Sequence, residues 1–322
     1  MNYMFPYHLV EQGSKIILYG EGKVGKEFYL QLHYNKYCVV EAWVDKVFDH
    51  FETNKPFDKV ANIGKYDFDY VVIAIADLAQ ANSIKQKLVN DGIETEKIIW
   101  SRSYMIDSDI FPDNRKMYLT NWNFYEELID DYVQIEQWFL GSGWYQGNSQ
   151  ISINGARNSG ERIIRYRILD YLTKDSDCLD IGCNCGFFDI ELAKFVNSVV
   201  GIDIEERFID LANKVKEFQK KDNVSFVAGN FMELKENAYD AVFSFAVHRY
   251  IFDSGITMEQ YTSKLFNLIR DNGFLFIESH GMESDRVDFP KVCKMFEESG
   301  MKVLYHGQSR ADVNRELVVF RK

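Results

Sequence analysis

The 322-residue sequence has few of the features that mark membrane, secreted or disulfide-stabilised proteins. It contains four prolines, and none of its apolar runs approaches the roughly 20 residues that a membrane-spanning helix needs. Its five cysteines are odd in number and unevenly spread, which indicates reduced thiols rather than a disulfide framework. The first ten residues lack the cationic start and apolar centre of a secretory signal. These absences predict a cytoplasmic protein with no membrane partner.

Positive charge is also in short supply. The chain carries 37 Lys and Arg against 49 Asp and Glu, which gives a formal net charge of −12. Non-specific binding to nucleic acid or to an anionic membrane needs a net basic surface, so this balance argues against both. With 46% hydrophobic and 27% charged residues the composition is that of a globular protein, and the length indicates two domains.

The first 105 residues alternate between short apolar runs and helical patterns, which predicts a small Rossmann-like α/β domain. Tyr70 to Ala76 is almost continuously apolar, as is typical of a parallel strand that is buried on both faces. The expected strands are 15–20, 39–44, 70–76 and 97–100, and the expected helices are 24–32 and 78–89.

A glycine motif lies in this first domain. Gly20, Gly22 and Gly25 form the pattern G-x-G-x-x-G between a strand and a helix, and Asp45 ends the next strand 20 residues after Gly25. This is the dinucleotide fingerprint with its ribose-binding acid. The domain also resembles the small Rossmann-like domains at the N-termini of bacterial sugar-modifying and surface-polysaccharide enzymes. That resemblance implies binding of a nucleotide or nucleotide-sugar, or only packing and homodimer contacts.

Residues 106–160 are expected to form a helical linker followed by a loop. Asn121 is placed to cap a helix through about Leu140, because apolar residues recur there at spacings of three and four. Residues 141–160 are rich in Gly, Ser and Asn, which favours a long functional loop over a packed element. The loop's candidate lid or substrate residues are Trp144, Tyr145 and Arg157.

Residues 161–322 again alternate between strands and helices and end in two runs that can pair antiparallel. This order predicts a doubly wound, seven-stranded α/β sheet with an antiparallel last strand, which we expect at the sheet edge. The expected strands are 178–181, 199–204, 224–228, 241–246, 274–278, 302–306 and 316–320. The expected helices are 161–172, capped by Ser159, and 187–195, 207–219, 258–270 and 290–299.

The first strand of this second domain ends in the loop Asp180-Ile-Gly-Cys-Asn-Cys-Gly186, and a helix begins at Phe187. Gly182 and Gly186 allow the backbone to approach a ligand, and the helix N-terminus offers N–H groups to a carboxylate. The loop's two cysteines have no histidine partner in the sequence nearby, so we expect small turn residues and no metal site.

Polar residues also end the next two strands. Asp203 lies 17 residues after Gly186, where its carboxylate can accept two hydrogen bonds from a ribose diol. Asn230 and Phe231 follow the third strand, where an amide can meet the edge of an adenine and an aromatic ring its face.

Together these motifs resemble those of class I S-adenosylmethionine-dependent methyltransferases over about residues 160–322. The resemblance implies S-adenosylmethionine as cofactor and S-adenosylhomocysteine as product. Two residues depart from the family pattern: Asn184 replaces the middle glycine and Asn230 replaces an acid, although asparagine tolerates a left-handed backbone. The implied cofactor residues are Asp180, Gly182, Asn184, Gly186, Phe187, Asp203, Ile204, Asn230, Phe231 and Phe245.

Two histidines follow strands where the reaction would need a base. His248 follows the fourth strand of this domain and His280 the fifth, and imidazole titrates near neutrality, so either can act as general base, with His248 the first choice. Arg249, Tyr250 and Arg286 lie at the same edge and are candidates to hold an anionic substrate.

The leading hypothesis is therefore O-methylation of a small-molecule or carbohydrate acceptor, related to surface-polysaccharide biosynthesis, by in-line transfer with a histidine base. One alternative is an RNA methyltransferase, because residues 248–250 and the loop aromatics could stack a base. Another is a non-catalytic nucleotide-binding regulatory or assembly protein, which the two departures favour. An NAD-dependent oxidoreductase comes last.

Overall fold

The structure is a computed structural model. It describes the chain except for residues 1, 4, 8, 47–54, 102–104, 107–120, 122, 123, 126, 129, 130, 133–143, 152, 154, 281–287 and 311–314. The chain divides into two compact units, Met1–Glu126 and Glu127–Lys322. Most of the helix expected over 121–140 lies outside the described residues. None of the described helices is long and apolar enough to cross a membrane.

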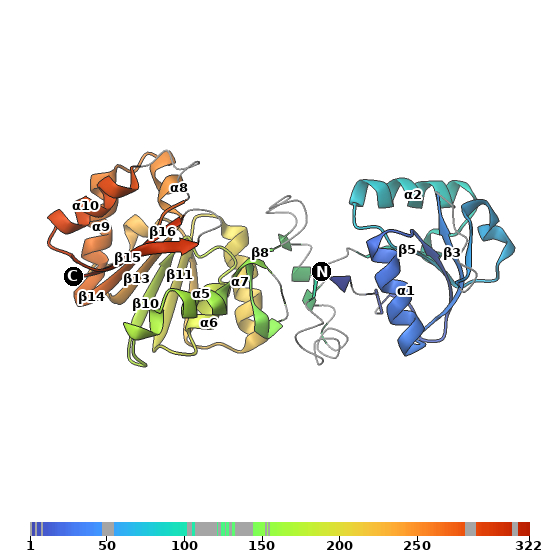
Figure 1. Cartoon of the computed structure of the whole chain (residues 1–322), viewed down its shortest axis with the longest axis horizontal. Coiled ribbons are helices and arrows are strands. Elements are labelled where there is room, and N and C mark those ends of the chain that lie inside the picture. The colour runs from blue at the N-terminus through green and yellow to red at the C-terminus, as the bar shows by residue number, and fades with distance from the viewer. Residues whose placement is uncertain are drawn as a thin grey trace. The chain divides into compact units, whose positions relative to one another are not determined.

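The first unit is built on a five-stranded parallel sheet in the order β4-β3-β2-β5-β6 (Figure 1). The strands are β2 (Lys15–Tyr19), β3 (Val39–Asp45), β4 (Phe57–Lys59), β5 (Tyr70–Ile73) and β6 (Ile98–Ile99). Helix α1 (Lys23–Asn35) packs on one face and α2 (Leu78–Asn90) on the other, because their apolar residues belong to separate clusters. A two-stranded pair, β1 (Asn2–Tyr3) with β7 (Met105–Ile106), completes the described strands of this unit.

Strand β4 was missing from our expectation of four strands. It has three residues, all half-buried or exposed, so it carries neither the alternation nor the apolar run that identifies a strand in a sequence. It is held by backbone pairing with β3 at the sheet edge.

The second unit contains the predicted seven-stranded sheet, in the order β12-β11-β10-β13-β14-β16-β15 (Figure 1). The strands are β10 (Asp177–Ile181), β11 (Ser198–Asp203), β12 (Val224–Ala228), β13 (Tyr239–Phe245), β14 (Ile269–Glu278), β15 (Lys302–Arg310) and β16 (Arg315–Arg321). The last strand, β16, is antiparallel to both neighbours, as predicted. The expectation that it lies at the edge is wrong, because β16 inserts between β14 and β15.

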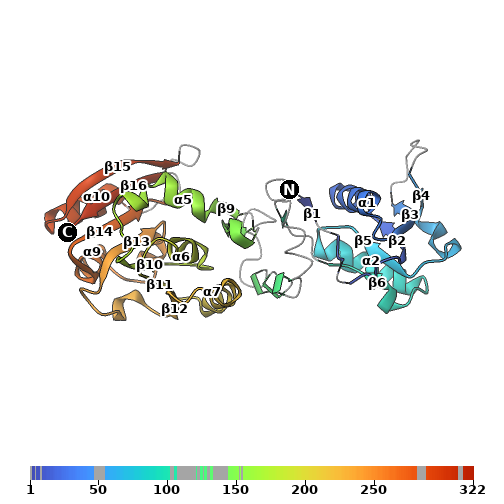
Figure 2. The ribbon, with the colours of Figure 1, turned by 90° about the horizontal axis from the view of Figure 1, so that it is seen from below.

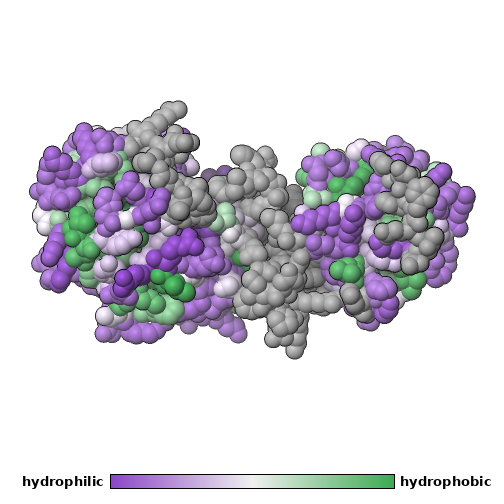
Figure 3. Space-filling model, viewed as in Figure 1, coloured by the Kyte–Doolittle hydropathy of each residue, from purple (hydrophilic) through white to green (hydrophobic). Residues whose placement is uncertain are grey.

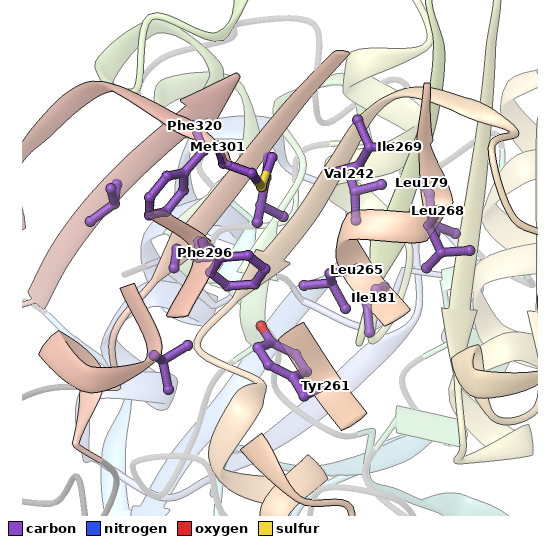
Figure 4. Packing of buried hydrophobic residues seen from close by; sticks show 14 of the residues in the cluster. Leu179, Ile181, Val242, Tyr261, Leu265, Leu268, Ile269, Phe296, Met301 and Phe320 are labelled. Atoms are coloured by element: carbon purple, nitrogen blue, oxygen red, sulfur yellow. The ribbon is translucent and has the colours of Figure 1, made fainter. Parts of the chain in front are cut away.

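Helices cover both faces of this sheet (Figure 2). On one face, α8 (His248–Asp253), α9 (Met258–Leu268) and α10 (Phe289–Glu298) pack on the strands through a single apolar cluster. Figure 4 shows part of this cluster, in which Leu265 of α9 and Phe296 of α10 lie near strand residues such as Val242. The other face carries α5 (Ser159–Arg165), α6 (Phe187–Leu192) and α7 (Glu206–Gln219).

The glycine-rich segment 141–160 is not wholly a loop, contrary to expectation. Its described residues form two short parallel strands, β8 (Trp144–Gly147) and β9 (Gly155–Asn158). The pairing of these two strands requires glycine at position 155, because a Cβ there would lie 2.2 Å from backbone atoms of Gln146. The following helix is capped by Asn158 rather than by Ser159, since the Glu161 N–H donates to Asn158 Oδ1 at 3.0 Å.

Candidate functional site

A pocket of about 530 Å³ opens where the parallel strands of the second unit end. This volume lies within the range typical of small-molecule sites, roughly 300–1,000 Å³. Several walls are apolar, and polar groups are contributed from the ends of β11, β14 and β16. The lining residues are Tyr145, Ile181, Gly182, Asn184, Ile202, Asp203, Ile204, Glu205, Phe208, Gly229, Asn230, Phe231, Phe245, Ala246, Val247, Tyr250, Ile251, Ser254, Ile256, His280 and Arg315.

The loop after β10 forms one wall and depends on unusual backbone conformations. Gly182 has φ +77°, and a Cβ there would lie 2.5 Å from the Val247 side chain. Asn184 also takes a left-handed conformation, with φ +53°, and its Oδ1 accepts the Cys185 N–H at 2.8 Å. Gly186 has φ +67°, and a Cβ there would lie 2.3 Å from the ring of Phe226. The asparagine at the middle position therefore fits the loop.

Asp203, the last residue of β11, ties this loop to the neighbouring strand. Its Oδ2 accepts the Asn184 N–H at 3.0 Å and its Oδ1 accepts the Glu205 N–H at 3.1 Å. Burial raises the pKa of Asp203, and the hydrogen bonds from these N–H groups oppose that shift. The carboxylate lines the pocket, so it is positioned to accept hydrogen bonds from a ligand as well.

Gln146 is a residue that sequence reasoning missed. Its side chain is 4% exposed and clamps the loop from the β8 side. Its Nε2 donates to the Cys183 carbonyl at 3.2 Å, and its Oε1 accepts the Phe187 N–H at 3.1 Å. The Phe187 N–H, which we expected to face a ligand, thus already has a partner. The two aromatic residues before it, Trp144 and Tyr145, are of a type that strands favour, but no local pattern marks the polar Gln146 as buried.

The part of the pocket at the ends of β11 and β12 offers an apolar and amide surface. Ile204 is 77% exposed and lines the pocket beside Phe231 and Asn230. Asn230 Oδ1 accepts the Met232 N–H at 3.0 Å, so its amide is held at the end of β12. Glu205 and Phe208 also line this side and were not predicted.

Asp180 lies beneath the loop rather than in the pocket lining. It is 4% exposed, and burial raises its pKa to about 8, although Arg162 opposes the shift. Asp189 on α6 is fully buried, and burial and the Asp180 charge raise its pKa as well. Two carboxyl groups in one buried region therefore resist ionisation. Gly186 and Phe187 also lie outside the lining, whereas Phe245 belongs to it.

The two candidate bases occupy different environments. His248, our first choice, begins α8 with 1% exposure, and its ring centroid lies 5.6 Å from that of Phe289. It is not among the pocket-lining residues. His280 is half-buried, lines the pocket, and has its ring centroid 5.3 Å from that of Tyr250. The chain turns into a helix directly after β13, which takes His248 into the core.

A buried polar network lies behind His280. Glu278 Oε1 accepts the Tyr166 hydroxyl at 2.5 Å and the Ser309 hydroxyl at 2.8 Å. Arg315 Nη1 lies 3.6 Å from Glu278 Oε2, and Arg315 Nε donates to the His280 carbonyl at 3.0 Å. We did not predict Arg315, because it stands at the start of a strand whose pairing partners are not evident from sequence.

The remaining candidates divide between the pocket and its surroundings. Tyr145 and Tyr250 line the pocket. Trp144 is buried and stacks on Tyr132 with ring centroids 4.0 Å apart, so it supports the wall rather than forming it. Two arginines, 157 and 249, are not lining residues, and Arg286 lies outside the described residues.

The glycine motif of the first unit is arranged around internal contacts. Trp43 Nε1 donates to the Gly20 carbonyl at 2.8 Å, and the Glu21 N–H donates to Asp45 Oδ2 at 2.7 Å. A Cβ on Gly25 would lie 1.9 Å from the Gly20 oxygen. A pocket of about 800 Å³ in this unit is lined by Asp45 and Lys46, by residues between 59 and 64 and by residues between 87 and 93 at the end of α2, but by none of residues 20–25.

Cys183 and Cys185 are buried and form no disulfide bond with any cysteine that the structure describes. Burial raises the pKa of the Cys183 thiol, which disfavours the thiolate that binds metals. Within the described part of the chain, no three His, Cys, Asp or Glu side chains lie close enough together to hold a metal ion.

Comparison with known proteins separates the two units in the same way. Residues 172–318 match the family model described as a methyltransferase domain, and residues 12–99 match one described as C2185-like, N-terminal. The U6 snRNA methylphosphate capping enzyme Amus of Drosophila melanogaster is 29% identical over 133 residues, covering 35% of this chain and 44% of that protein.

Human EEF1A lysine methyltransferase 2 is 26% identical over 152 residues, covering 44% of this chain and 63% of that protein. The chain therefore spans less than two thirds of either relative. Among solved structures, the N-methyltransferase NodS from Bradyrhizobium japonicum WM9 is similar, with a TM-score of 0.42 and 21% identity over 51% of this chain and 97% of that one.

Proposed function

We propose that the C-terminal unit, a class I S-adenosylmethionine-dependent methyltransferase domain, methylates a hydroxyl group of a small-molecule acceptor of the sugar or surface-polysaccharide type. The observation that carries the proposal is the pocket at the ends of β10 to β14, in which the glycine loop and Asp203 form a hydrogen-bonded wall. The acceptor class is supported by the pocket's size and by the absence of net positive charge in the sequence.

The pocket's residues fit the cofactor. Asp203 has a carboxylate that can accept the ribose hydroxyls, while Ile204, Phe231 and Asn230 form an apolar and amide surface for adenine. Gly182 and Asn184 belong to the loop that lines the pocket where the methionine part of S-adenosylmethionine would lie. S-adenosylmethionine supplies an electrophilic methyl group on a sulfonium. The chain's contribution is to hold that group and the acceptor oxygen in line.

His280 is the residue we assign as general base. It lines the pocket, whereas His248 does not. His280 would accept the proton of the acceptor hydroxyl, the methyl group supplied by bound S-adenosylmethionine would replace that proton, and S-adenosylhomocysteine would be the leaving group. A positioned base contributes roughly 10²–10⁴ in rate.

The proposed cofactor site is tested by calorimetric titration of the full chain with S-adenosylhomocysteine. We expect micromolar binding in the wild type and a loss of at least about 100-fold in Asp203→Ala, because two charge-assisted hydrogen bonds are removed. NADH and nucleotide-sugars are titrated in parallel. If S-adenosylhomocysteine does not bind, and one of these ligands binds in a way that Gly22→Ala abolishes, the proposal is wrong.

The base assignment is tested by His280→Asn, which keeps a hydrogen-bonding side chain but cannot accept the proton. The rate of S-adenosylhomocysteine release should fall about 10²–10⁴-fold, with unchanged cofactor affinity. This rate is measured with an acceptor preparation that the wild-type protein methylates. His248→Asn should mainly lower the melting temperature, because His248 is 1% exposed. A full rate in His280→Asn would remove His280 from the mechanism.

An RNA acceptor is the second candidate, because the relative Amus is by its name a capping enzyme that acts on U6 snRNA. Methylation of RNA requires contacts to phosphates, which make binding strongly salt-dependent. Filter binding of a structured RNA between low and physiological salt tests this candidate. The binding of nucleotides or nucleotide-sugars by the N-terminal unit, or its pairing in a homodimer, stays a prediction.

A further inference from the structure

The two sides of the pocket in the second unit carry opposite charge. Asp203 and Glu205 line it at the end of β11, whereas Arg315 lines it at the start of β16. Strands β10, β13 and β14 lie between β11 and β16. At about 4.8 Å from one strand to the next, the backbones of β11 and β16 lie about 19 Å apart. An anionic ligand would be repelled at the first side and attracted at the second.

Arg315 is held rigidly at its side. It is 8% exposed, and its Nε donates to the His280 carbonyl at 3.0 Å, which fixes the plane of the guanidinium. Its Nη1 lies 3.6 Å from Glu278 Oε2, beyond hydrogen-bonding distance. Nη1 is buried and makes no hydrogen bond to any residue that the structure describes.

Glu278 does not compensate Arg315 fully. Its Oε1 already accepts two hydroxyl hydrogen bonds, from Tyr166 and Ser309. Its charge also acts on Arg162, a second arginine with 8% exposure whose guanidinium lies 5.2 Å from the centroid of the Phe245 ring. Glu278 thus faces two buried guanidinium groups, and Asp180 is a second carboxyl group that acts on Arg162. Leaving a buried charge incompletely paired costs free energy, which a ligand of opposite charge would recover.

We propose that Arg315 binds an oxyanion of the acceptor, a carboxylate or a phosphate, directly beside His280. The inference rests on the proposed function, because it assigns the acceptor side of the same pocket. A guanidinium suits both groups, because its planar N–H donors can hydrogen-bond to the oxygens of a carboxylate or of a phosphate. The acceptor is then a hydroxy acid or a phosphate ester whose anionic group lies near the hydroxyl to be methylated.

The cofactor offers one competing oxyanion, the carboxylate of its methionine part. If Arg315 held that group, replacing it would weaken S-adenosylhomocysteine binding. If Arg315 holds the acceptor, cofactor affinity stays nearly unchanged and only the second ligand is lost. Cofactor affinity therefore separates the two occupants.

The experiment uses the full chain saturated with S-adenosylhomocysteine. The probes are inorganic phosphate and acetate, with acetamide as the neutral match to acetate, and the readout is the dependence of the melting temperature on probe concentration. The variants are Arg315→Met, which removes the charge at similar length, and Arg315→Lys, which keeps it without the fork. A cooperative melting transition of the unliganded chain verifies that each variant is folded.

We expect phosphate, acetate or both to stabilise the wild type, and acetamide to have no effect. Arg315→Met should weaken binding of the oxyanion by about 10- to 100-fold, and Arg315→Lys should weaken it less. The affinity for S-adenosylhomocysteine should stay within about twofold of the wild-type value in both variants. A response to phosphate alone would indicate a phosphate ester, and a response to acetate alone a hydroxy acid.

Three results would overturn the proposal: neither oxyanion stabilises the wild type, Arg315→Met responds like the wild type, or Arg315→Met loses S-adenosylhomocysteine instead. Failure of the wild type to bind S-adenosylhomocysteine would refute the proposed function. The titration of phosphate and acetate would then be repeated without S-adenosylhomocysteine, to test whether Arg315 binds an oxyanion independently of that function.

Discussion

The two units of this chain solve the same local problem and reach different results. Each has a glycine-containing loop after the first strand of its main sheet, β2 or β10, and an aspartate at the end of the adjacent strand, Asp45 or Asp203. In each, the aspartate accepts a backbone N–H from the loop, at 2.7 Å from Glu21 and at 3.0 Å from Asn184. The second loop lines the pocket of about 530 Å³, whereas residues 20–25 do not line the pocket of about 800 Å³ in the first unit.

The difference lies in what surrounds each loop. In the first unit the buried Trp43 bonds to Gly20, and Gly25 is required because its neighbour Gly20 lies against it. In the second unit the loop is clamped from outside by Gln146, and its lining face stays open between Ile204 and Val247. The glycine pattern therefore specifies a tight strand-to-helix turn, and a ligand site needs walls from other elements. Figure 3 shows that polar residues cover much of the visible surface of both units.

The largest expected contrast between the units concerns pH. Asp180 lies two residues before Gly182, and the corresponding residue before Gly20 is the fully buried Leu18. The folded state raises the pKa of Asp180 to about 8, so folding binds a proton. This stabilisation is complete below the unfolded pKa and is lost as pH rises towards 8, by at most about 6 kcal/mol.

Asp180→Asn, which keeps the shape without the ionisation, should remove that loss. Urea unfolding at pH 5.5 and pH 8 measures it: stability should fall less between the two pH values in Asp180→Asn than in the wild type. Asp175→Asn changes an exposed carboxylate of the same unit and is the control. Equal losses in all three proteins would show that Asp180 ionises freely.

The second contrast separates the glycines of the first unit. Gly25→Ala should destabilise this unit by about 1–3 kcal/mol, because the new methyl group would meet a backbone oxygen. Gly22→Ala is the matched control, since Gly22 has a φ of −62° and open space around its Cβ position. Hydrogen exchange should increase in residues 15–45 of Gly25→Ala and remain unchanged in residues 177–203. Equal exchange in the two variants would contradict the packing role of Gly25.

Sequence periodicity was sufficient for most of the fold. Apolar strands such as β5 and β13 and amphipathic helices such as α7 are specified by local pattern. The three-residue β4 is held by backbone pairing with β3, and the short β8 and β9 are held by pairing with each other, which periodicity does not reveal. The placement of β16 inside the sheet likewise depends on a partner choice between β14 and β15.

The candidate site divides along the same line. Residues within motifs, such as Gly182, Asp203 and Asn230, were predicted and line the pocket, because the ends of parallel strands meet at one sheet edge. Gln146 and Arg315 were missed, because each reaches the site from an element whose position depends on tertiary packing. Local sequence also did not distinguish the buried His248 from the pocket-lining His280.

The smallest expected effect tests the clamp that distinguishes the second loop from the first. Gln146→Ala removes the bonds to the Cys183 carbonyl and the Phe187 N–H, at 3.2 and 3.1 Å, and leaves both buried groups without this partner. The loop would lose its fixed conformation, so S-adenosylhomocysteine should bind about tenfold more weakly, which corresponds to about 1.4 kcal/mol. Calorimetry measures the change, with the exposed Gln150→Ala as control. Gln146 is not a lining residue, so a loss of affinity in Gln146→Ala but not in Gln150→Ala would mean that cofactor binding depends on the loop conformation that β8 imposes. Unchanged affinity in Gln146→Ala would mean that Asp203 suffices to hold the loop in that conformation.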